Sequence, residues 1–210
     1  MEEFTEIRNG WLWPKDDVRC WRCFFHLKSK DLPSRILQHV NKKSLCVQAG
    51  GNVGVYVKEF ASVFQTVHTF EPEPLNFYCL EHNLKDCENV ILHHGFVSDK
   101  KQLPKNIVRF DTKKDPNTGK FKIGEESGNI SVFSIDGMQL ESCDLIQLDI
   151  EGHEPQALTG ALETIKKYRP VICLEWFDNQ EQLLSILKKI NYQQVADLRS
   201  DRIFIHQDTI

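Results

Sequence analysis

A run of small residues that joins an apolar segment to a helical pattern constrains this chain most. The run is Gly50-Gly51-Asn52-Val53-Gly54, and residues 45–49 before it are apolar enough for a buried strand. After the run, apolar side chains recur at helical spacing, at Val53, Val57, Phe60, Ala61 and Phe64. Glycine lets a backbone approach a ligand closely, and the start of a helix offers free N–H groups. A strand, a glycine turn and a helix in this order predict a site for a nucleoside.

The next predicted strand, residues 66–70, is followed by an acid. This residue is Glu71, seventeen positions after Gly54. Folds of this kind place near that point the carboxylate that binds the ribose hydroxyls. Glu71 is therefore the candidate ribose ligand.

Two classes of nucleoside cofactor fit this unit. A dinucleotide fingerprint needs G-x-G-x-x-G, and here that frame begins with Ala49 in place of the first glycine. The other frame, Gly50-x-Asn52-x-Gly54, is similar to the first motif of methyltransferases that use S-adenosylmethionine. The turn favours the methyl donor over a nicotinamide dinucleotide, and a turn that binds nothing is the third alternative.

Length and charge narrow the function classes. A chain of 210 residues suits one domain with a substantial core, and its net charge of −4 argues against bulk binding to nucleic acid or anionic membranes. No apolar run is long enough to span a bilayer, and the first four residues do not begin a signal peptide. We therefore expect a cytoplasmic protein with no membrane partner.

The seven cysteines do not suggest a disulfide framework, because their number is odd and their spacing irregular. Cys46 and Cys173 fall in predicted core strands. Cys20, Cys23 and His26 have the spacing of metal ligands, but no second pair completes a tetrahedral zinc site, so packing is favoured.

Residues 1–43 differ from the rest in being rich in aromatic side chains, namely Trp11, Trp13, Trp21, Phe24 and Phe25. Short helices are expected within 17–29 and over 33–40. The aromatic side chains either pack this segment against the domain or make it a lid or acceptor platform that stacks on a sugar or base.

From residue 44 onward, strands and helices alternate, which predicts a parallel sheet covered on both faces. The expected strands are 45–49, 66–70, 90–94, 144–150, 171–175, 192–197 and 202–206, and the expected helices are 53–65, 74–84, 155–168 and 179–190. Residues 95–135 break this rhythm. We expect one or two edge strands there, near 106–111 and 130–134, with an exposed loop at 115–119.

Polar side chains end four of these strands, at Gln48, Glu71, Asp149 and Glu175. In an open parallel sheet the ligand lies beyond the carboxyl ends of the strands, so we expect these groups to face one crevice. Methylation of a hydroxyl needs a base that takes its proton or a metal that lowers its pKa. Asp149, Glu151 and His153 are the catalytic candidates for either route, with the metal-free route favoured. Glu154 is better explained as an acid that starts a helix.

Seven motifs resemble those of the FkbM-type methyltransferases in order and spacing. They are Val47-Gln-Ala-Gly-Gly-Asn-Val-Gly54, Thr69-Phe-Glu-Pro-Glu-Pro74, Val90-Ile-Leu-His-His-Gly-Phe-Val-Ser-Asp99, Ser134-Ile-Asp136, Leu148-Asp-Ile-Glu-Gly-His-Glu154, Ala157-Leu-Thr-Gly-Ala161 and Val171-Ile-Cys-Leu-Glu175. The resemblance covers residues 44–206. It implies a class I methyltransferase (Rossmann-like) α/β fold, a doubly wound and mostly parallel seven-stranded sheet with helices on both faces. On this basis 44–210 is the methyltransferase domain, and 1–43 holds much of the acceptor specificity.

The resemblance also implies the cofactor and the site. The cofactor is S-adenosyl-L-methionine, with the glycine turn under its methionine part, Glu71 on its ribose and residues around Phe96 beside its adenine. Asp149 and Glu151 stand at the reaction centre. Gln48 departs from the family, which usually has aspartate there, and it brings no charge to attract the ammonium of the donor. The cofactor-binding candidates are Gln48, Gly50, Gly51, Asn52, Gly54, Glu71, Phe96 and Asp149.

The resulting hypothesis is O-methylation of a hydroxyl on a sugar or similar polyol, either a small molecule or a glycan. The alternatives are a methyltransferase that acts on nucleic acid, a nicotinamide-dependent oxidoreductase, and a catalytically weak module that binds S-adenosylmethionine. The sequence does not indicate the oligomeric state.

Overall fold

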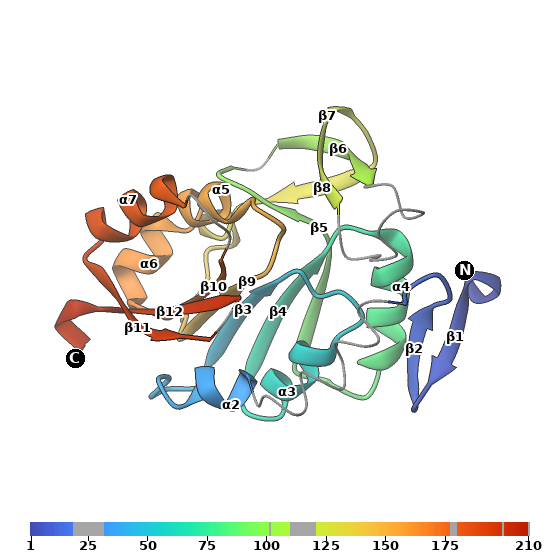
Figure 1. Cartoon of the computed structure of the whole chain (residues 1–210), viewed down its shortest axis with the longest axis horizontal. Helices are drawn as coiled ribbons and strands as arrows, with labels where there is room; N and C mark the ends of the chain where they lie inside the picture. Colours follow the sequence, from blue (N-terminus) through green and yellow to red (C-terminus); the bar gives the residue numbers. More distant parts are fainter. Residues whose placement is uncertain (19–31, 101, 110–120, 177–179, 199, 210) are drawn as a thin grey trace.

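The computed structural model describes the whole chain except residues 19–31, 101, 110–120, 177–179, 199 and 210. The described residues form a ten-stranded sheet flanked by helices, and a two-stranded hairpin lies to one side (Figure 1). The sheet runs in the order β11-β12-β10-β9-β3-β4-β5-β8-β6-β7.

Parallel strands form the centre of this sheet. They are β3 (Leu45–Ala49), β4 (Thr66–Glu71), β5 (Val90–Val97), β9 (Leu145–Leu148) and β10 (Val171–Glu175). Their near-continuous apolar sequences suit strands that are buried on both faces. Beyond β10 the antiparallel strands β12 (Asp201–His206) and β11 (Tyr192–Asp197) complete this side. The seven strands predicted for the core are thus present and adjacent.

In the described chain the sheet has ten strands instead of the seven that the family resemblance implied: the two further strands predicted near 106–111 and 130–134 are present, and one more, over 121–127, was not predicted. The strand β5 continues past its expected end, and its last residues pair in parallel with β8 (Ile130–Phe133). Two antiparallel strands follow outward, β6 (Gln102–Arg109) and β7 (Phe121–Ser127). A small apolar cluster under these strands stabilises the extension, formed by Phe96, Ile130 and Val132 with Ile107 and Ile123. The loop predicted at 115–119 lies outside the described residues.

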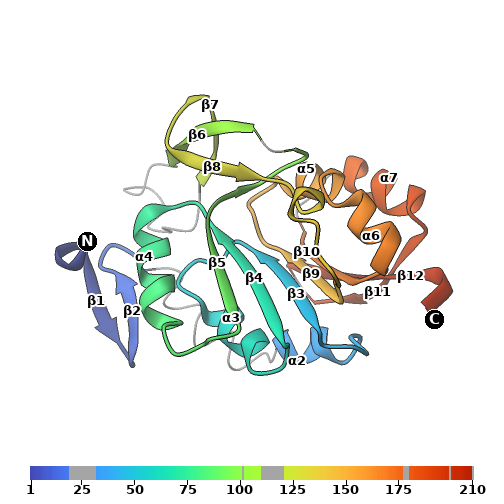
Figure 2. The same cartoon turned by 180° about the vertical axis from the view of Figure 1, so that it is seen from behind.

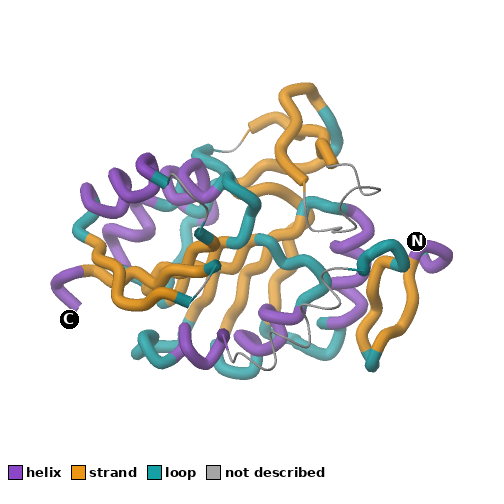
Figure 3. The backbone as a smooth tube through the Cα atoms, in the orientation of Figure 1, coloured by secondary structure: helices purple, strands orange, loops and turns teal. Residues whose placement is uncertain are grey.

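Helices cover the two faces of the central strands (Figure 3). One face carries α2 (Leu32–Leu37), α3 (Val55–Ala61) and α4 (Pro74–Asn83), and the other carries α5 (Glu154–Thr159), α6 (Leu162–Tyr168) and α7 (Glu181–Lys189). Short 3-10 turns occur at Glu2–Phe4, Asp136–Met138 and Gln207–Thr209. Side chains of β3 alternate between the two cores, as the pleat requires: Cys46 packs on the α3 side, and Val47 on the α5 side.

The single helix predicted over 155–168 is two helices in the structure. The carboxylate of Asp136 caps the start of the second helix, because its oxygens accept the peptide N–H groups of Glu163 at 3.1 Å and of Thr164 at 2.8 Å. These groups belong to the first turn of α6, where N–H groups have no partner within the helix. The helix predicted over 53–65 is also shorter, since α3 covers only Val55–Ala61.

An N-terminal hairpin, which the sequence did not predict, consists of β1 (Thr5–Arg8) and β2 (Trp11–Pro14). Figures 1 and 2 show α4 between this hairpin and the central strands. The amide of Asn83 joins the two parts, because it exchanges two hydrogen bonds with the backbone of Leu12, at 2.8 and 3.0 Å. Trp13 is buried against Val53 and Cys79. Trp13 therefore packs the segment against the domain.

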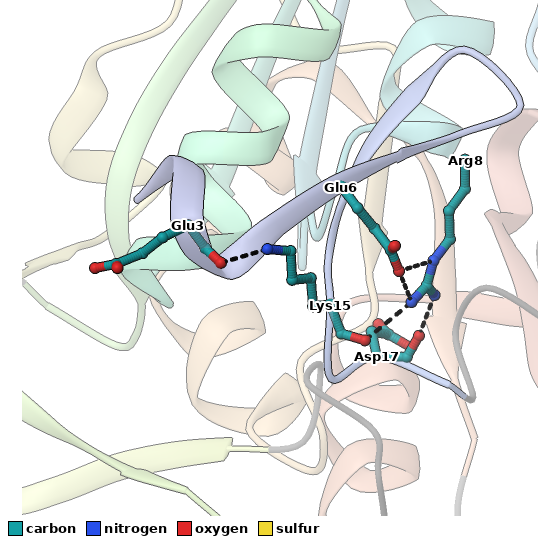
Figure 4. A network of polar contacts seen from close by, with 5 residues as sticks. All are labelled: Glu3, Glu6, Arg8, Lys15 and Asp17. Atoms are coloured by element: carbon teal, nitrogen blue, oxygen red, sulfur yellow. Dashed lines mark hydrogen bonds and ion pairs between the residues drawn. The ribbon is translucent and has the colours of Figure 1, made fainter.

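Polar contacts close the hairpin at its open end (Figure 4). The guanidinium of Arg8 donates to the backbone carbonyls of Lys15 and Asp17 and pairs with Glu6, while the Lys15 ammonium donates to the carbonyl of Glu3 at 2.6 Å. The helix predicted within 17–29, the cysteine pair Cys20 and Cys23 and most of the aromatic side chains lie outside the described residues, so a lid stays a prediction.

In the described chain no helix is both long enough and apolar enough to cross a membrane. Cys46 and Cys173 are buried in core strands, as predicted.

Candidate functional site

The register of the sheet brings four strand ends together. Ala49 of β3 pairs with Phe70 of β4 on one side and with Leu148 of β9 on the other. Leu148 in turn pairs with Leu174 of β10. Because these strands are parallel, the next position on each lies at the same edge of the sheet. Those positions belong to Gly50, Glu71, Asp149 and Glu175.

The glycine turn crosses this edge in close contact with β9. The peptide N–H groups of Gly50 and Gly51 both donate to the carbonyl of Phe70, at 3.0 and 2.9 Å. Gly50 has φ +86°, and a Cβ there would lie 1.9 Å from the backbone carbonyl oxygen of Asp149. Gly54 has φ +98° and precedes α3. Glycine is required at position 50 because the turn touches the end of β9.

The carboxylate of Glu71 holds the turn on the other side. One oxygen accepts the peptide N–H of Asn52 at 2.7 Å, and the other accepts that of Glu73 at 2.9 Å. Asn52 takes φ +47°, and its side-chain oxygen accepts the N–H of Val53 at 2.8 Å. Burial raises the pKa of Glu71 to about 8, although the hydrogen bond from Asn52 opposes the shift. Glu71 therefore fixes the conformation of the glycine turn, which lies beside it at the edge of the sheet.

Gln48 lies on β3, two residues before Gly50 and the edge of the sheet, and it is fully buried. Its Nε2 donates to the carbonyl oxygen of Gly50 at 3.0 Å, and its Oε1 accepts the hydroxyl of Thr69 at 2.5 Å. Both contacts are internal, so in this conformation the side chain supports the turn from within the protein. Its contact with a cofactor stays a prediction.

Asp149 and Glu175 share a hydrogen bond at the ends of β9 and β10. Burial raises the pKa of both groups. For Glu175 the charge of Asp149 adds to this effect, whereas for Asp149 the hydrogen bond from Glu175 opposes it. Two carboxyl groups in contact do not both ionise readily. We therefore assign the shared proton to Glu175, which donates it to an ionised Asp149.

Asp201 is a third acid at this edge that the sequence analysis missed. It starts β12, pairs in register with Glu175, and is 6% exposed. Burial, followed by the charge of Asp149, raises the pKa of Asp201 to about 7. The sequence signal was weak, because an acid between two closing strands reads as an ordinary turn residue.

The turn that follows β9 is stabilised by Glu154, the residue at which the turn ends. Glu154 is fully buried, and its Oε1 accepts the peptide N–H groups of Ile150 at 3.0 Å and Gly152 at 3.4 Å. These bonds stabilise a turn in which Glu151 has φ +55° and Gly152 has φ +93°. Glu154 starts α5, as predicted, and in addition it fixes the residues that carry the catalytic candidates.

His153 reaches from this turn to the end of β5. Its Nε2 lies 3.1 Å from the hydroxyl of Ser98, which is 2% exposed. Burial lowers the pKa of His153, and the charge of Asp99 opposes the shift. Ser98 falls within one of the motifs given above, yet nothing in its sequence context pointed to a histidine partner 55 residues away.

Phe96 is 6% exposed and packs with Ile130 and Val132 in the cluster under the extension of the sheet. This position places it next to the end of β5. Its contact with adenine stays a prediction.

The site fits S-adenosylmethionine in one respect and departs from the family pattern in another. Glu71 already accepts hydrogen bonds from the peptide N–H groups of Asn52 and Glu73 and from the side chain of Asn76. Because a carboxylate can accept about four, one ribose hydroxyl can still be accommodated without displacing these partners. Gln48 offers no charge to the ammonium of the donor, while the ionised Asp149 lies on the adjacent strand. In the described chain, no group of three or more His, Cys, Asp or Glu side chains is placed to hold a metal ion.

The chain matches a family model in sequence and several solved structures in fold. The family model of the FkbM methyltransferase domain matches residues 48–197. Methyltransferase FkbM from Methylobacillus flagellatus KT is 17% identical, with a TM-score of 0.55, over 91% of this chain and 55% of that chain. The chain therefore spans about half the length of that protein. None of the curated proteins compared with the chain matches it in sequence.

Two further structures resemble the whole domain. Precorrin-6y C5,15-methyltransferase from Geobacter metallireducens GS-15 is 13% identical, with a TM-score of 0.53, over 83% of this chain and 87% of that chain. A putative methyltransferase from Streptococcus mutans, in complex with SAH, is 10% identical, with a TM-score of 0.52, over 83% and 94%. At such identities these likenesses show the fold, which is the predicted α/β fold of class I methyltransferases.

Proposed function

The chain belongs to the FkbM methyltransferase family, and from this premise we propose that it transfers the methyl group of S-adenosylmethionine to a hydroxyl oxygen of a sugar or similar polyol. The motifs had predicted this family. When bound, the cofactor supplies an electrophilic methyl group on a sulfonium centre. The protein has to hold the cofactor, position the hydroxyl and accept its proton.

The proposal rests on the side chains at the carboxyl ends of the four adjacent parallel strands. In it, Glu71 accepts the ribose hydroxyls beside the turn that it clamps. Asp149 accepts the proton of the acceptor hydroxyl, since it is ionised, held by Glu175 and at the rigid end of a central strand. A raised pKa makes Asp149 a stronger base than an ordinary aspartate. Glu151 and His153 flank the acceptor from the following turn.

The acceptor in this proposal is a small molecule or glycan. The carboxylates of Asp149 and Glu151 give the site a negative charge, which repels the phosphates of a nucleic acid. We also propose that residues 1–43 contribute to acceptor binding.

Purified chain, methyl-labelled S-adenosylmethionine and a panel of sugars and polyols test the proposal. We expect S-adenosylhomocysteine to form only when a hydroxyl acceptor is present, and mass spectrometry to place the label on oxygen. Methylation of RNA or DNA but of no polyol would overturn the acceptor class. Cofactor binding without transfer to any acceptor would instead support the binding-module alternative.

A further inference from the structure

Ser98 and His153 meet although 55 residues separate them in the chain. His153 Nε2 lies 3.1 Å from the hydroxyl oxygen of Ser98, and that oxygen lies 3.2 Å from Oδ1 of Asp99. The three side chains form a chain of hydrogen bonds that runs from the exposed carboxylate of Asp99, after β5, to His153 in the turn after β9.

The chemistry of the groups sets the direction of these hydrogen bonds. A carboxylate exposed to water is ionised at neutral pH and can only accept, so the single hydroxyl proton of Ser98 goes to Asp99. The oxygen of Ser98 must then accept the Nε2–H of His153. In a neutral imidazole the other nitrogen is an acceptor, which leaves a lone pair on Nδ1. No hydrogen-bond partner of Nδ1 occurs in the described part of the chain.

The backbone holds Ser98 in one place. Its peptide N–H donates to the carbonyl of Phe133 at 2.8 Å, and a Cβ on Gly160 would lie 2.0 Å from its carbonyl oxygen. Strand β8 therefore fixes Ser98 from one side, and the end of α5 contacts it from the other. An acceptor fixed in this way can orient an imidazole ring as well as bond to it.

We propose that Ser98, supported by Asp99, is a positioning residue that fixes His153 as the Nε2–H tautomer, so that Nδ1 is the acceptor for a hydroxyl of the substrate. This inference rests on the proposed function, which places His153 at the reaction centre. It deepens that function by naming the substrate class: an acceptor with a second hydroxyl beside the reacting one. An acceptor with an ether or carbonyl there would face a lone pair and bind less well.

Nuclear magnetic resonance of the ¹⁵N-labelled full chain tests these hydrogen bonds without cofactor or substrate. His153→Gln identifies the signals of His153 among the eight histidines. In the wild type at pH 7.5–8 we expect a single neutral tautomer with the proton on Nε2. In Ser98→Ala we expect a mixture of tautomers and a lower pKa of His153, because the protonated ring loses the hydroxyl oxygen that accepts its Nε2–H.

Three further variants make the result decisive. Ser98→Thr keeps the hydroxyl and should restore the wild-type tautomer, while Ser131→Ala, an exposed serine on β8, should leave the His153 signals unchanged. Asp99→Asn alters only an exposed side chain, and it should lower the pKa of His153 even if Ser98→Ala does not fold. A wild-type ring protonated on Nδ1, or an unchanged pKa in both Ser98→Ala and Asp99→Asn, would overturn the proposal. Absence of methyl transfer to polyols would contradict the proposed function and leave these spectra unaffected.

Discussion

The carboxylate of Glu71 accepts the peptide N–H of Asn52 at 2.7 Å, so the acid at the end of β4 clamps the glycine turn at the end of β3. The same carboxylate is the proposed ligand of the ribose hydroxyls. One residue therefore couples the shape of the turn to the binding of the cofactor. Its removal should affect both the stability of the protein and its affinity for the nucleoside.

Above pH 8, where Glu71 is ionised, Glu71→Ala should weaken binding of S-adenosylmethionine and S-adenosylhomocysteine by about 1.5–3 kcal/mol, the scale of hydrogen bonds to a charged group. Isothermal titration calorimetry on the folded variant measures this effect. Glu73→Ala is the matched control, since Glu73 accepts the N–H of Asn76 at 2.6 Å as the cap of α4. The control should lose about 1 kcal/mol of stability and keep its affinity. Unchanged affinity in Glu71→Ala would remove Glu71 from the site.

Gly50→Ala and Gly152→Ala separate steric clash from backbone strain. Both glycines have a similar positive φ, +86° and +93°, but a Cβ at 50 would lie 1.9 Å from the carbonyl oxygen of Asp149, and a Cβ at 152 would meet nothing within 4 Å. We expect Gly152→Ala to cost about 1–2 kcal/mol, the penalty of the left-handed conformation. Gly50→Ala should cost clearly more, or prevent folding. Equal midpoints in urea denaturation would contradict the close approach of the turn to β9.

The core of the fold was predictable because its signals are local. The apolar run at 45–49 followed by glycine, and Pro74 at the start of α4, each fix an element without reference to the rest of the chain. In the extension, β6 and β8 were predicted as edge strands, but β7 and the place of β8 beside β5 were not, because the apolar cluster there forms only after strands distant in sequence pair. The cap at the start of α6 comes from Asp136, which lies in another segment of the chain.

The site was predictable as a set of strand ends and less so as a set of partners. Glu71 and Asp149 follow apolar runs, so their place at the edge of the sheet could be inferred from sequence. The hydrogen bond between Asp149 and Glu175, the burial of Asp201 and the contact of Ser98 with His153 depend on strand order and helix placement. No pattern within a single segment encodes such contacts.

Asp201→Asn should stabilise the protein at pH 8 relative to the wild type and do so much less at pH 5. The pKa of Asp201 is about 7 in the fold, against 3.8 as the reference value. Between these values the native state keeps a proton that the unfolded chain has lost, so wild-type stability falls as the pH rises through this window. The asparagine variant cannot ionise at this position and does not lose stability in this way. Its free energy of unfolding at pH 8 should therefore exceed that of the wild type by on the order of a few kcal/mol.

Urea denaturation at the two pH values measures the Asp201→Asn effect. Asp197→Asn is the control, because Asp197 is exposed and its ion pair with Arg202, at 2.7 Å, should contribute less than about 1 kcal/mol at either pH. A difference between Asp201→Asn and the wild type that does not grow with pH would show that Asp201 is ionised in the fold at both values.

Gln48→Asp should destabilise the protein, although it restores the residue that the family usually has. The Nε2 group of Gln48 donates to the carbonyl of Gly50, and aspartate would leave this oxygen without a donor beside a buried charge. The expected cost is about 1–3 kcal/mol. Gln48→Glu, which keeps the length of the side chain, is the matched comparison. Unchanged stability together with tighter cofactor binding would mean that the side chain turns towards the ligand, as the sequence alone suggests.

Asp149→Asn tests the chemistry. The change keeps the shape of the side chain and its place beside Glu175, but an amide cannot accept the proton of the acceptor hydroxyl. We expect the fold to persist and turnover to fall by about 10²–10⁴, the usual range for the loss of a general base. Asp144→Asn is the control at the other end of β9, where Asp144 accepts the N–H of Ser44 at 2.7 Å. This control should lose stability and keep its turnover.

The same assay decides whether a metal takes part in the reaction. The described residues offer no group of three or more ligands, so we expect a chelator to leave wild-type turnover unchanged. If turnover is lost on chelation and restored by Mg²⁺ or Mn²⁺, the hydroxyl is activated by a metal instead of by Asp149 alone. If Asp149→Asn retains near-normal turnover on the true acceptor, Asp149 is neither base nor ligand. The proton would then have to pass to another group of the same turn, either Glu151 or His153.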